Sequence, residues 1–331
     1  MRICYIFRNS RAGYSIKKVF DTFIPYIINK RVVELPTHRA NPISVVQNLF
    51  YLLLRKEKKC LYHLTGNVEY CALVLPPKRT ILTIHDMVLI NHNDVNKIKK
   101  LFFYYVWYKW PLKRAALVTC ISQKTKNELL DYFPWVADKT IVIPNPVSSD
   151  IVYKKKEGSM QNPIILHIGT RENKNLERVI LALSGIECRL RIIGDLSEQQ
   201  INFLCQQKIN YSTASNLTDA EIAQEYVHCD IVSFPSTYEG FGMPIIEGFA
   251  SGRVVVTSNI EPMREVSNGK TILVDPYSVE SIHKGFLTAI RCPEFRQNLI
   301  IGGLREAMKY APEKVAQQYE NCYRKIKENL K

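Results

Sequence analysis

The segment Glu239-Gly-Phe-Gly-Met-Pro-Ile-Ile-Glu247 indicates both the fold of this 331-residue chain and the place of its site. It follows Asp230-Ile-Val-Ser-Phe-Pro-Ser236, whose apolar run predicts a short buried strand. Gly240 and Gly242 allow a backbone path that other residues rarely adopt, and the proline after them is typical of the first turn of a helix. The segment therefore predicts a strand, a loop and a helix, with the first glutamate in the loop and the second on the helix.

The start of this helix is suited to bind a phosphate group. Backbone N–H groups are unpaired at a helix N-terminus, and open α/β sheets bind phosphate-bearing ligands at the carboxyl ends of their strands. Carboxylates on both sides of the turn, at Glu239 and Glu247, can accept hydrogen bonds from sugar hydroxyl groups. The alternative is an ordinary strand, loop and helix with two solvated glutamates.

These residues resemble the signature of the retaining glycosyltransferases of family 4, in which two glutamates with seven residues between them follow a strand ending in Pro-Ser. The resemblance implies that Glu239 contacts the hydroxyl groups of the donor sugar and serves catalysis. It implies that Glu247 contacts the ribose of the nucleotide. Gly240, Phe241 and Gly242 are expected at the same donor site.

A second segment, Ile164-Ile-Leu-His-Ile-Gly-Thr-Arg-Glu-Asn-Lys-Asn-Leu176, has a related pattern. Its apolar strand ends at Gly169, a candidate for the donor site, and the loop that follows carries Arg171 and Lys174 before a helix begins. Two cations beside a helix N-terminus suit a diphosphate. In the family that the chain resembles, a basic pair in this loop neutralises the leaving nucleoside diphosphate, which implies catalytic roles for both residues. The alternative is surface charge at a strand end.

Strand-like and helix-like segments alternate along the whole chain, which predicts parallel sheets covered on both faces. A chain of 331 residues exceeds what one hydrophobic core usually supports, so two domains are expected. The segment Pro144-Asn-Pro-Val-Ser-Ser149 and the charged run after it predict a linker. We therefore expect a Rossmann-like acceptor-side domain over 1–147 and a Rossmann-like nucleotide-sugar-binding domain over 160–311.

The last segment, 312–331, predicts a helix with one apolar stripe. The stripe consists of Val315, Tyr319, Cys322, Ile326 and Leu330. The family resemblance implies an α/β fold of the GT-B type, with two doubly wound domains facing across a cleft. It also implies that the last helix crosses back to the N-terminal domain.

Two strand ends with histidine are expected on the acceptor side. His85-Asp86 ends an apolar strand where relatives of this sequence carry a His-Asp pair, which implies a catalytic role for His85 with Asp86 as its support. His63-Leu-Thr-Gly-Asn67 resembles the His-x-Thr-Gly-Asp stretch of family members, with Asn in place of Asp, and His63 and Gly66 are expected to shape the acceptor pocket. The alternative for His85 and Asp86 is a histidine bonded to strand-end backbone and an aspartate that caps the next turn.

The loop after the first strand, Arg8-Asn-Ser-Arg-Ala-Gly-Tyr-Ser15, contains one glycine where many relatives have a pair. We expect Gly13 to present its backbone N–H group to the donor diphosphate or to the acceptor.

The chain has a net charge of +14, which indicates a polyanionic partner such as acidic lipid, a nucleotide or nucleic acid. Segment 97–114 holds six cations, seven aromatic residues and no acid. This mixture favours an anionic membrane surface, and the alternative is a helix whose aromatic residues pack under the sheet. Segment 49–59 is a second candidate. Binding of nucleic acid is not expected, because the basic residues are dispersed.

Nine cysteines without metal-ligand spacing indicate a reducing compartment, and no signal peptide or membrane-spanning run is recognisable. We therefore expect a cytoplasmic protein. If 97–114 binds lipid, we expect the protein to be peripheral at the inner face of the cytoplasmic membrane.

The sequence contains neither Asp-x-Asp nor HExxH, which predicts a metal-independent reaction with no cofactor besides the nucleoside-diphosphate sugar. The motifs resemble those of bacterial surface-polysaccharide enzymes, which make O-antigen, capsule or lipopolysaccharide. The resemblance implies a glycan or a polyprenyl- or lipid-linked glycan as acceptor. Two other functions stay open: a sugar-nucleotide epimerase of the same fold, and a non-enzymatic basic protein that binds nucleic acid.

Overall fold

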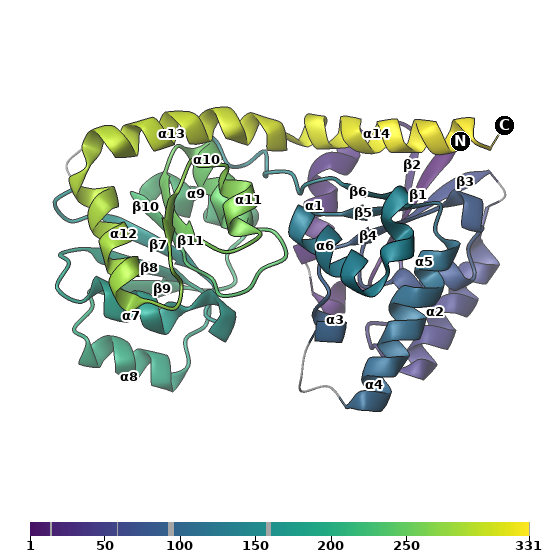
Figure 1. Cartoon of the computed structure of the whole chain (residues 1–331), viewed down its shortest axis with the longest axis horizontal. Coiled ribbons are helices and arrows are strands. Elements are labelled where there is room, and N and C mark those ends of the chain that lie inside the picture. The colour runs from purple at the N-terminus through teal and green to yellow at the C-terminus, as the bar shows by residue number, and fades with distance from the viewer. Residues whose placement is uncertain (14, 58, 92–95, 157–159, 331) are drawn as a thin grey trace. The chain divides into compact units, whose positions relative to one another are not determined.

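The computed structural model describes all residues of the chain except 14, 58, 92–95, 157–159 and 331. The chain forms two compact units (Figure 1). Unit 1 comprises Met1–Pro146 and Pro312–Lys331, and unit 2 comprises Val147–Ala311. Each unit contains a six-stranded sheet in which neighbouring strands run parallel. The predicted α/β fold of two Rossmann-like units is confirmed.

The sheet of unit 1 has the strand order β2-β1-β3-β4-β5-β6. β3 and β4 are buried along their whole length, as expected for parallel strands covered on both faces. Because all strands run parallel, their carboxyl ends meet at one edge of the sheet. The strands are β1 (Arg2–Phe7), β2 (Lys30–Glu34), β3 (Cys60–Leu64), β4 (Thr80–Ile84), β5 (Leu117–Cys120) and β6 (Thr140–Val142).

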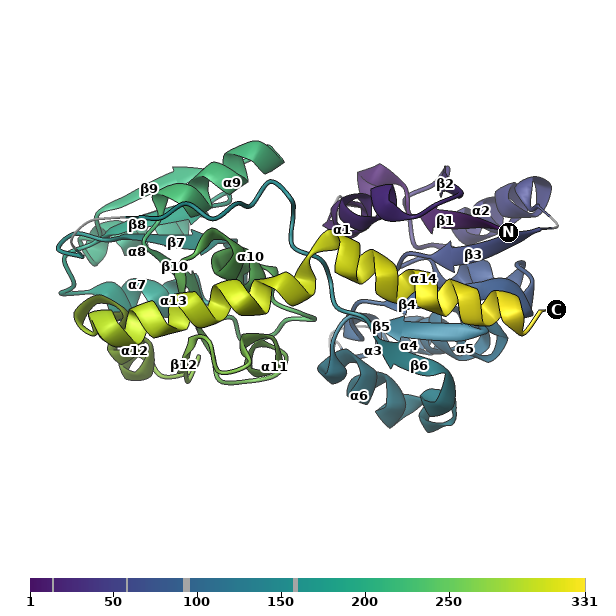
Figure 2. The same ribbon diagram turned by 90° about the horizontal axis from the view of Figure 1, so that it is seen from above.

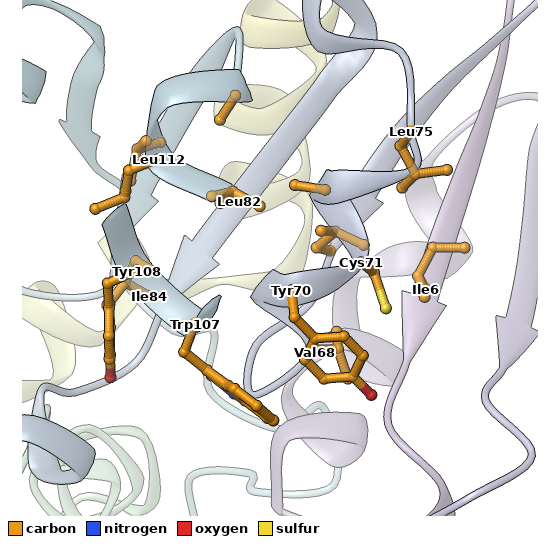
Figure 3. Packing of buried hydrophobic residues seen from close by; sticks show 14 of the residues in the cluster. Ile6, Val68, Tyr70, Cys71, Leu75, Leu82, Ile84, Trp107, Tyr108 and Leu112 are labelled. Atoms are coloured by element: carbon orange, nitrogen blue, oxygen red, sulfur yellow. The ribbon is translucent and has the colours of Figure 1, made fainter. Parts of the chain in front are cut away.

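One hydrophobic core of unit 1 gathers buried residues from the sheet, from α2, from the 3-10 helix η3 and from the helical run α4-η5-α5 (Figure 3). The middle of this run, η5, is a π-helix. Trp107 packs against Tyr70, with 4.6 Å between the ring centroids. The elements are α2 (Pro42–Arg55), η3 (Glu69–Leu73), α3 (Val88–Asn91), α4 (Lys97–Phe102), η5 (Phe103–Lys109), α5 (Trp110–Arg114) and α6 (Gln123–Tyr132).

A second core of unit 1 lies under α1 (Ser15–Phe23) and α14 (Pro312–Glu328). Figure 2 shows α14 lying along the sheet of this unit. Tyr319 stacks on Phe23, with ring centroids 4.8 Å apart, and most of the predicted apolar stripe is buried. The expected return of the last helix to the N-terminal domain is therefore confirmed.

His63 lies inside this second core. Its Nδ1 is 2.7 Å from the Tyr323 hydroxyl, which is in turn 2.9 Å from the Tyr5 hydroxyl. Its Nε2 is 2.7 Å from the Thr83 hydroxyl, and Thr83 is 2.7 Å from Thr119. Burial lowers the pKa of His63 to about 3, so the ring is neutral at physiological pH. The structure thus corrects the expectation that His63 shapes an acceptor pocket, because its side chain is fully buried and both ring nitrogens are bonded to core hydroxyl groups.

The sheet of unit 2 has the strand order β12-β11-β10-β7-β8-β9. Capping boxes start two helices of this unit, with Ser197 and Gln200 at α8 and Thr218 and Glu221 at α9. The strands are β7 (Ile164–Ile168), β8 (Arg189–Ile193), β9 (Tyr211–Ala214), β10 (Ile231–Phe234), β11 (Val254–Ser258) and β12 (Ile272–Val274). The helices are α7 (Leu176–Leu183), α8 (Glu198–Gln206), α9 (Asp219–His228), α10 (Met243–Ser251), α11 (Met263–Ser267), α12 (Val279–Arg291) and α13 (Pro293–Ala307).

Over the described part of the chain, no helix combines the length and the apolar character needed to cross a bilayer.

His63→Gln is expected to reduce the pH dependence of the stability of unit 1. The folded state depresses the pKa of His63 below its ordinary value of 6.5, so the stability due to neutral His63 is present above pH 6.5 and is lost as the pH falls toward 3. At pH 5 the loss in the wild type amounts to about 2 kcal/mol, from about 1.4 kcal/mol per pH unit. The stability difference between wild type and variant should therefore shrink by about this amount between pH 7 and pH 5.

Urea denaturation followed by tryptophan fluorescence measures this difference, because all three tryptophans (107, 110 and 135) belong to unit 1. All other titrating groups are the same in the wild type and in the variant, so their contributions to the pH dependence cancel in the stability difference. A stability difference that is the same at both pH values would contradict a neutral, buried His63.

Candidate functional site

The segment that follows β10 forms the predicted loop and helix. Glu239 lies in the loop, with 16% of its side chain exposed, and Glu247 lies on α10 with 7% of the residue exposed. Gly242 is the residue before α10 and has a φ of 128°, a conformation that favours glycine, and a proline lies in the first turn. The helix start is therefore at the carboxyl end of β10, where the positive end of the helix dipole favours an anion, although the Ile245 N–H already donates to the Gly242 carbonyl at 3.0 Å.

Lys174 and Glu239 join the two predicted segments. Lys174 Nζ lies 2.6 Å from Glu239 Oε1, and the two residues belong to the loops after β7 and β10, which are adjacent strands. The side chain of Lys174 passes over Gly169, whose φ is 94°. A Cβ at Gly169 would come within 2.9 Å of Lys174 Cγ, so the glycine makes room for the lysine. The ammonium group also lies 5.2 Å from the ring centroid of Phe234.

Two asparagines, which the sequence analysis did not single out, hold these loops together. Asn173 Nδ2 donates to the Tyr238 carbonyl at 3.0 Å and to Glu239 Oε1 at 3.3 Å. Asn175 is left-handed, with a φ of 66°, and its Nδ2 donates to the carbonyls of Pro235 (2.9 Å) and Pro276 (2.7 Å). Asparagine tolerates a left-handed backbone better than most residues. An asparagine directly before the helix is therefore a sequence signal from which this conformation at position 175 could have been predicted.

Arg171, the other predicted cation, is exposed at the N-terminal end of the same loop. Its guanidinium forms no ion pair or hydrogen bond with another residue of the described chain. It is therefore free to meet a ligand, whereas Lys174 is already paired.

Glu247 is oriented from inside unit 2. The Tyr226 hydroxyl donates to Glu247 Oε2 at 2.6 Å, and burial together with this carboxylate raises the pKa of Tyr226 well above its usual range. The tyrosine therefore remains a neutral donor. Phe241, which was expected at the donor site, is 5% exposed and packs edge-on against Tyr310, with 6.0 Å between centroids. Its side chain is therefore part of the core of unit 2.

A surface cavity of about 450 Å³ lies at the carboxyl ends of β8 and β9. Its lining includes Asp195, Tyr211 and Ser215. Thr170 Oγ1 donates to the Asp195 carbonyl at 2.6 Å, which connects the cavity to the loop that carries Arg171. The ends of β8, β7 and β10 therefore form one hydrogen-bonded edge.

In unit 1, His85 lies at the end of β4 and contacts Gly66. Its Nε2 donates to the Thr65 carbonyl at 2.8 Å, so Nδ1 is the acceptor, and enclosure lowers the pKa of the ring. A Cβ at Gly66, whose φ is 124°, would approach the ring to 2.5 Å. Asp86 Oδ1 accepts the backbone N–H of Val88 at 3.1 Å. The alternative given for these two residues, a histidine bonded to backbone and an aspartate that caps the next turn, is thus present. Nδ1 of His85 is the ring atom that remains to accept a hydrogen bond from a ligand.

Gly13 does not offer its N–H group as expected. The Gly13 N–H donates to the Ser10 carbonyl at 3.1 Å and closes a turn, so it is not directed at a ligand. Among the residues that the structure describes, no three His, Cys, Asp or Glu side chains are clustered so that they could hold a metal ion.

Comparisons with known proteins cover both halves of the chain. Residues 150–305 match the family model of the glycosyl transferases group 1, and residues 18–151 match that of Glycosyltransferase Family 4. O-antigen chain mannosyltransferase B of Escherichia coli is 24% identical over 294 residues, which are 82% of this chain and 76% of that protein. The serotype-specific mannosyltransferase WbdA of Escherichia coli is 23% identical over 260 residues, which are 71% of this chain and only 32% of WbdA.

Among solved structures, Anabaena HepE in complex with UDP and glucose superposes with a TM-score of 0.78 at 16% identity. The match covers 97% of this chain and 99% of HepE, and it shows a shared GT-B type of fold. Since the two family models together extend from residue 18 to residue 305, and the Glu239–Glu247 segment agrees with the family signature, the chain belongs to the family 4-like glycosyltransferases.

Proposed function

We propose that the chain transfers a sugar from a nucleoside diphosphate to a glycan or lipid-linked glycan acceptor, with retention of the anomeric configuration and without a metal ion. The observation that carries this proposal is the contact between Lys174 and Glu239 at the carboxyl edge of unit 2. It combines a cation for the diphosphate with a carboxylate for the sugar hydroxyl groups, beside the N-terminus of α10.

The donor diphosphate would lie against the start of α10, where Arg171 and Lys174 approach it. Lys174 would exchange its carboxylate partner for the phosphate oxygens, which frees Glu239 to accept hydrogen bonds from the sugar. Glu247, held by Tyr226, would accept from the ribose hydroxyls. The cavity beyond β8 and β9 has room for the nucleoside.

Metal independence rests on these two cations. The negative charge that develops on the leaving diphosphate needs positive groups in fixed positions, and preorganised donors in an enclosed site stabilise such charge strongly. Lys174 is preorganised by Glu239 and by its packing over Gly169. Arg171 is exposed and would complete the charge when the donor binds.

Retention is proposed through attack on the face that the leaving group vacates. A double displacement needs a free carboxylate beneath the anomeric carbon. Asn173 donates to Glu239 and would still hold this carboxylate after Lys174 has turned to the phosphate oxygens, which suits a group that binds hydroxyls better than a nucleophile. In unit 1, Nδ1 of His85 can accept a hydrogen bond from a hydroxyl group, with Asp86 holding the turn beside it.

The names of the relatives support the choice of substrates. Two of them are mannosyltransferases, of O-antigen chain and serotype-specific type, which supports a mannosyl donor and a role in bacterial surface polysaccharide. Polyprenyl- or lipid-linked glycans are the acceptors that we propose. All nine cysteines are free in the structure, which suits the reducing conditions of the cytoplasm.

We also propose that unit 1 contacts an anionic membrane surface through 97–114, at the inner face of the cytoplasmic membrane. Phe103, Trp107 and Tyr108 are buried, as the alternative of a packed helix requires. Another part of the segment faces outward: Ile98 is 79% exposed and Trp110 is 47% exposed, beside exposed lysines. The segment therefore has both an inner packed side and an outer basic, apolar side.

Helix α2 adds to this outer surface. It packs into the same core as η5, and its outward side chains are large and apolar. They are Ile43, Val46, Phe50, Leu53 and Leu54. Segment 36–56 contains no acidic residue and has basic residues at both ends, which suits insertion between anionic headgroups.

The proposed reaction predicts that nucleoside diphosphate is released from GDP-mannose or UDP-glucose only when a glycan or polyprenyl-linked acceptor fraction is present. Release should be undiminished after treatment with EDTA. The assay is the rate of nucleoside diphosphate formation with and without acceptor. Equal release from donor alone would favour the epimerase, and loss of activity with EDTA would refute metal independence.

The two glutamates are expected to separate binding from turnover. Glu247→Gln should weaken binding of the free nucleoside diphosphate about tenfold, because it loses a contact to the ribose. Glu239→Gln should leave that binding within about threefold but lower turnover about 100-fold. Lys174→Ala should cost about 2–4 kcal/mol of transition-state stabilisation, or about 30- to 1000-fold in turnover.

Calorimetric titration and initial rates measure the two effects. Glu187→Gln, an exposed change in unit 2, serves as the matched control. If all of these variants match the wild type in both measurements, the assignment of the donor site fails.

Changing Lys97, Lys99, Lys100 and Lys109 together to Gln is expected to weaken binding to anionic vesicles. Each basic residue near such a surface contributes about 1 kcal/mol, and the contribution falls with rising salt. The matched control changes Lys208, Lys270, Lys284 and Lys309 of unit 2 to Gln, which removes the same charge. Co-sedimentation with anionic vesicles measures the binding of the two quadruple variants and of the wild type. Equal binding by both quadruple variants would assign 97–114 to packing alone.

A further inference from the structure

A cavity of about 190 Å³ lies within unit 1, on the side of the carboxyl ends of its strands. Residues that follow β1, β2 and β3 line it, and no lining residue is acidic. Val68, Tyr70 and Trp107, which Figure 3 shows close together, form part of its apolar wall. Its polar lining consists mainly of Arg8, Thr37, His38, Arg39 and Asn67.

Arg8 has no partner in this cavity. Its Nε is buried without a hydrogen-bond partner, and the guanidinium makes no ion pair with any residue of the described chain. Its surroundings are confined, since a Cβ at Gly13 would lie 2.9 Å from Nη2. Burial lowers the pKa of Arg8 because the charged form loses hydration. A partly buried cation without a partner is costly, so the site is complete only with an anion.

The carboxylates near Arg8 do not pair with its guanidinium, so they neutralise its positive charge poorly. Asp86 acts on it electrostatically but lies too far from Arg8 for an ion pair, and its Oδ1 accepts the backbone N–H of Val88. Glu69 is 4% exposed; its Oε1 accepts the Asn67 N–H at 2.8 Å, and Oε2 is buried without a hydrogen-bond partner. Burial raises the pKa of Glu69 to about 7, so this side chain is largely neutral below that pH. Arg8 therefore retains positive charge for a ligand.

The dimensions and the chemistry of the cavity identify the class of ligand. A volume of about 190 Å³ is smaller than the pockets that enclose drug-sized molecules, but it admits a phosphate or diphosphate group. Arginine binds such groups through two parallel N–H donors, and the cavity has a second arginine at position 39. The apolar wall suits a hydrocarbon portion attached to the anion.

We propose that this cavity binds the phosphate or diphosphate group of the acceptor, held by Arg8 and Arg39. The inference rests on the proposed function, since it gives the acceptor an anionic group and assigns that group to unit 1. It is a different site from the donor diphosphate site, which lies in unit 2. The same chemistry occurs in a lipid carrier and in a soluble sugar phosphate.

Binding of inorganic pyrophosphate to the full chain tests the proposal. The Lys174→Ala background suppresses binding at the donor site, and tryptophan fluorescence reports on unit 1, because all three tryptophans, including Trp107 in the cavity wall, belong to it. Arg8→Gln and Arg39→Gln should each weaken binding at least tenfold. Arg11→Gln, an exposed change in the same loop as Arg8 but outside the cavity lining, should bind as the parent does.

Arg39 is exposed, so its change tests the site even where Arg8→Gln impairs folding. Urea denaturation followed by tryptophan fluorescence shows whether unit 1 of the variants is folded, because all three tryptophans belong to this unit. Pyrophosphate affinity that is equal in the parent and in both variants would overturn the proposal. Tighter binding of farnesyl diphosphate than of glucose 1-phosphate assigns the anion to a lipid carrier, and the reverse order assigns it to a soluble sugar phosphate.

The two hypotheses can fail separately. If pyrophosphate binding depends on Arg8 and Arg39 but no sugar transfer is found, the anion site stands and the proposed function fails. If sugar transfer is found but neither arginine affects the KM for the acceptor or pyrophosphate binding, the proposed function stands and this inference fails.

Discussion

The carboxyl edge of the sheet in unit 2 depends on the ion pair between Lys174 and Glu239. The pair joins loops that are 65 residues apart in sequence and adjacent in the sheet. Each charge neutralises the other in the free protein, so neither is buried alone, which would be costly. A ligand with a diphosphate next to hydroxyl groups offers new partners to both. The same contact therefore stabilises this edge and, in the proposed function, would exchange for contacts to a ligand of mixed chemistry. Asn173 and Asn175 hold the loops together around it.

Much of this arrangement could be predicted from the sequence, because local patterns determine it. The apolar runs of β7 and β10 and the helix starts that follow them are short-range signals, and parallel strands must bring their carboxyl ends to one edge. Glu239, Glu247 and Lys174 follow from that geometry and from the family signature. The hydrogen bonds of the asparagines were not predictable, because they depend on carbonyl groups in distant loops.

His63 and Gly13 show where such prediction fails. His63 lies in a strand that is buried on both faces, so alternation cannot reveal which polar residue is inside, and its partner Tyr323 is 260 residues away. Gly13 was interpreted from its conformational freedom, but its N–H group is used within its own turn. In 97–114 the packed helix of the alternative is present, since one side of the helical run is buried, whereas membrane contact of the exposed side stays a prediction. A periodic pattern identifies the two sides of a helix but not what covers the outer one.

The return of α14 to unit 1 has a consequence for the order in which the protein is made. Unit 2 is continuous in sequence, so all of its residues are available to fold once residue 311 has left the ribosome. Unit 1 begins first but lacks Tyr319 and Tyr323, and with them the hydroxyl group that bonds to His63, until the residues after 311 have also been synthesised. Until then one apolar face of the N-terminal sheet is covered by α1 but not by α14, so unit 1 becomes complete only after all of unit 2 has been made.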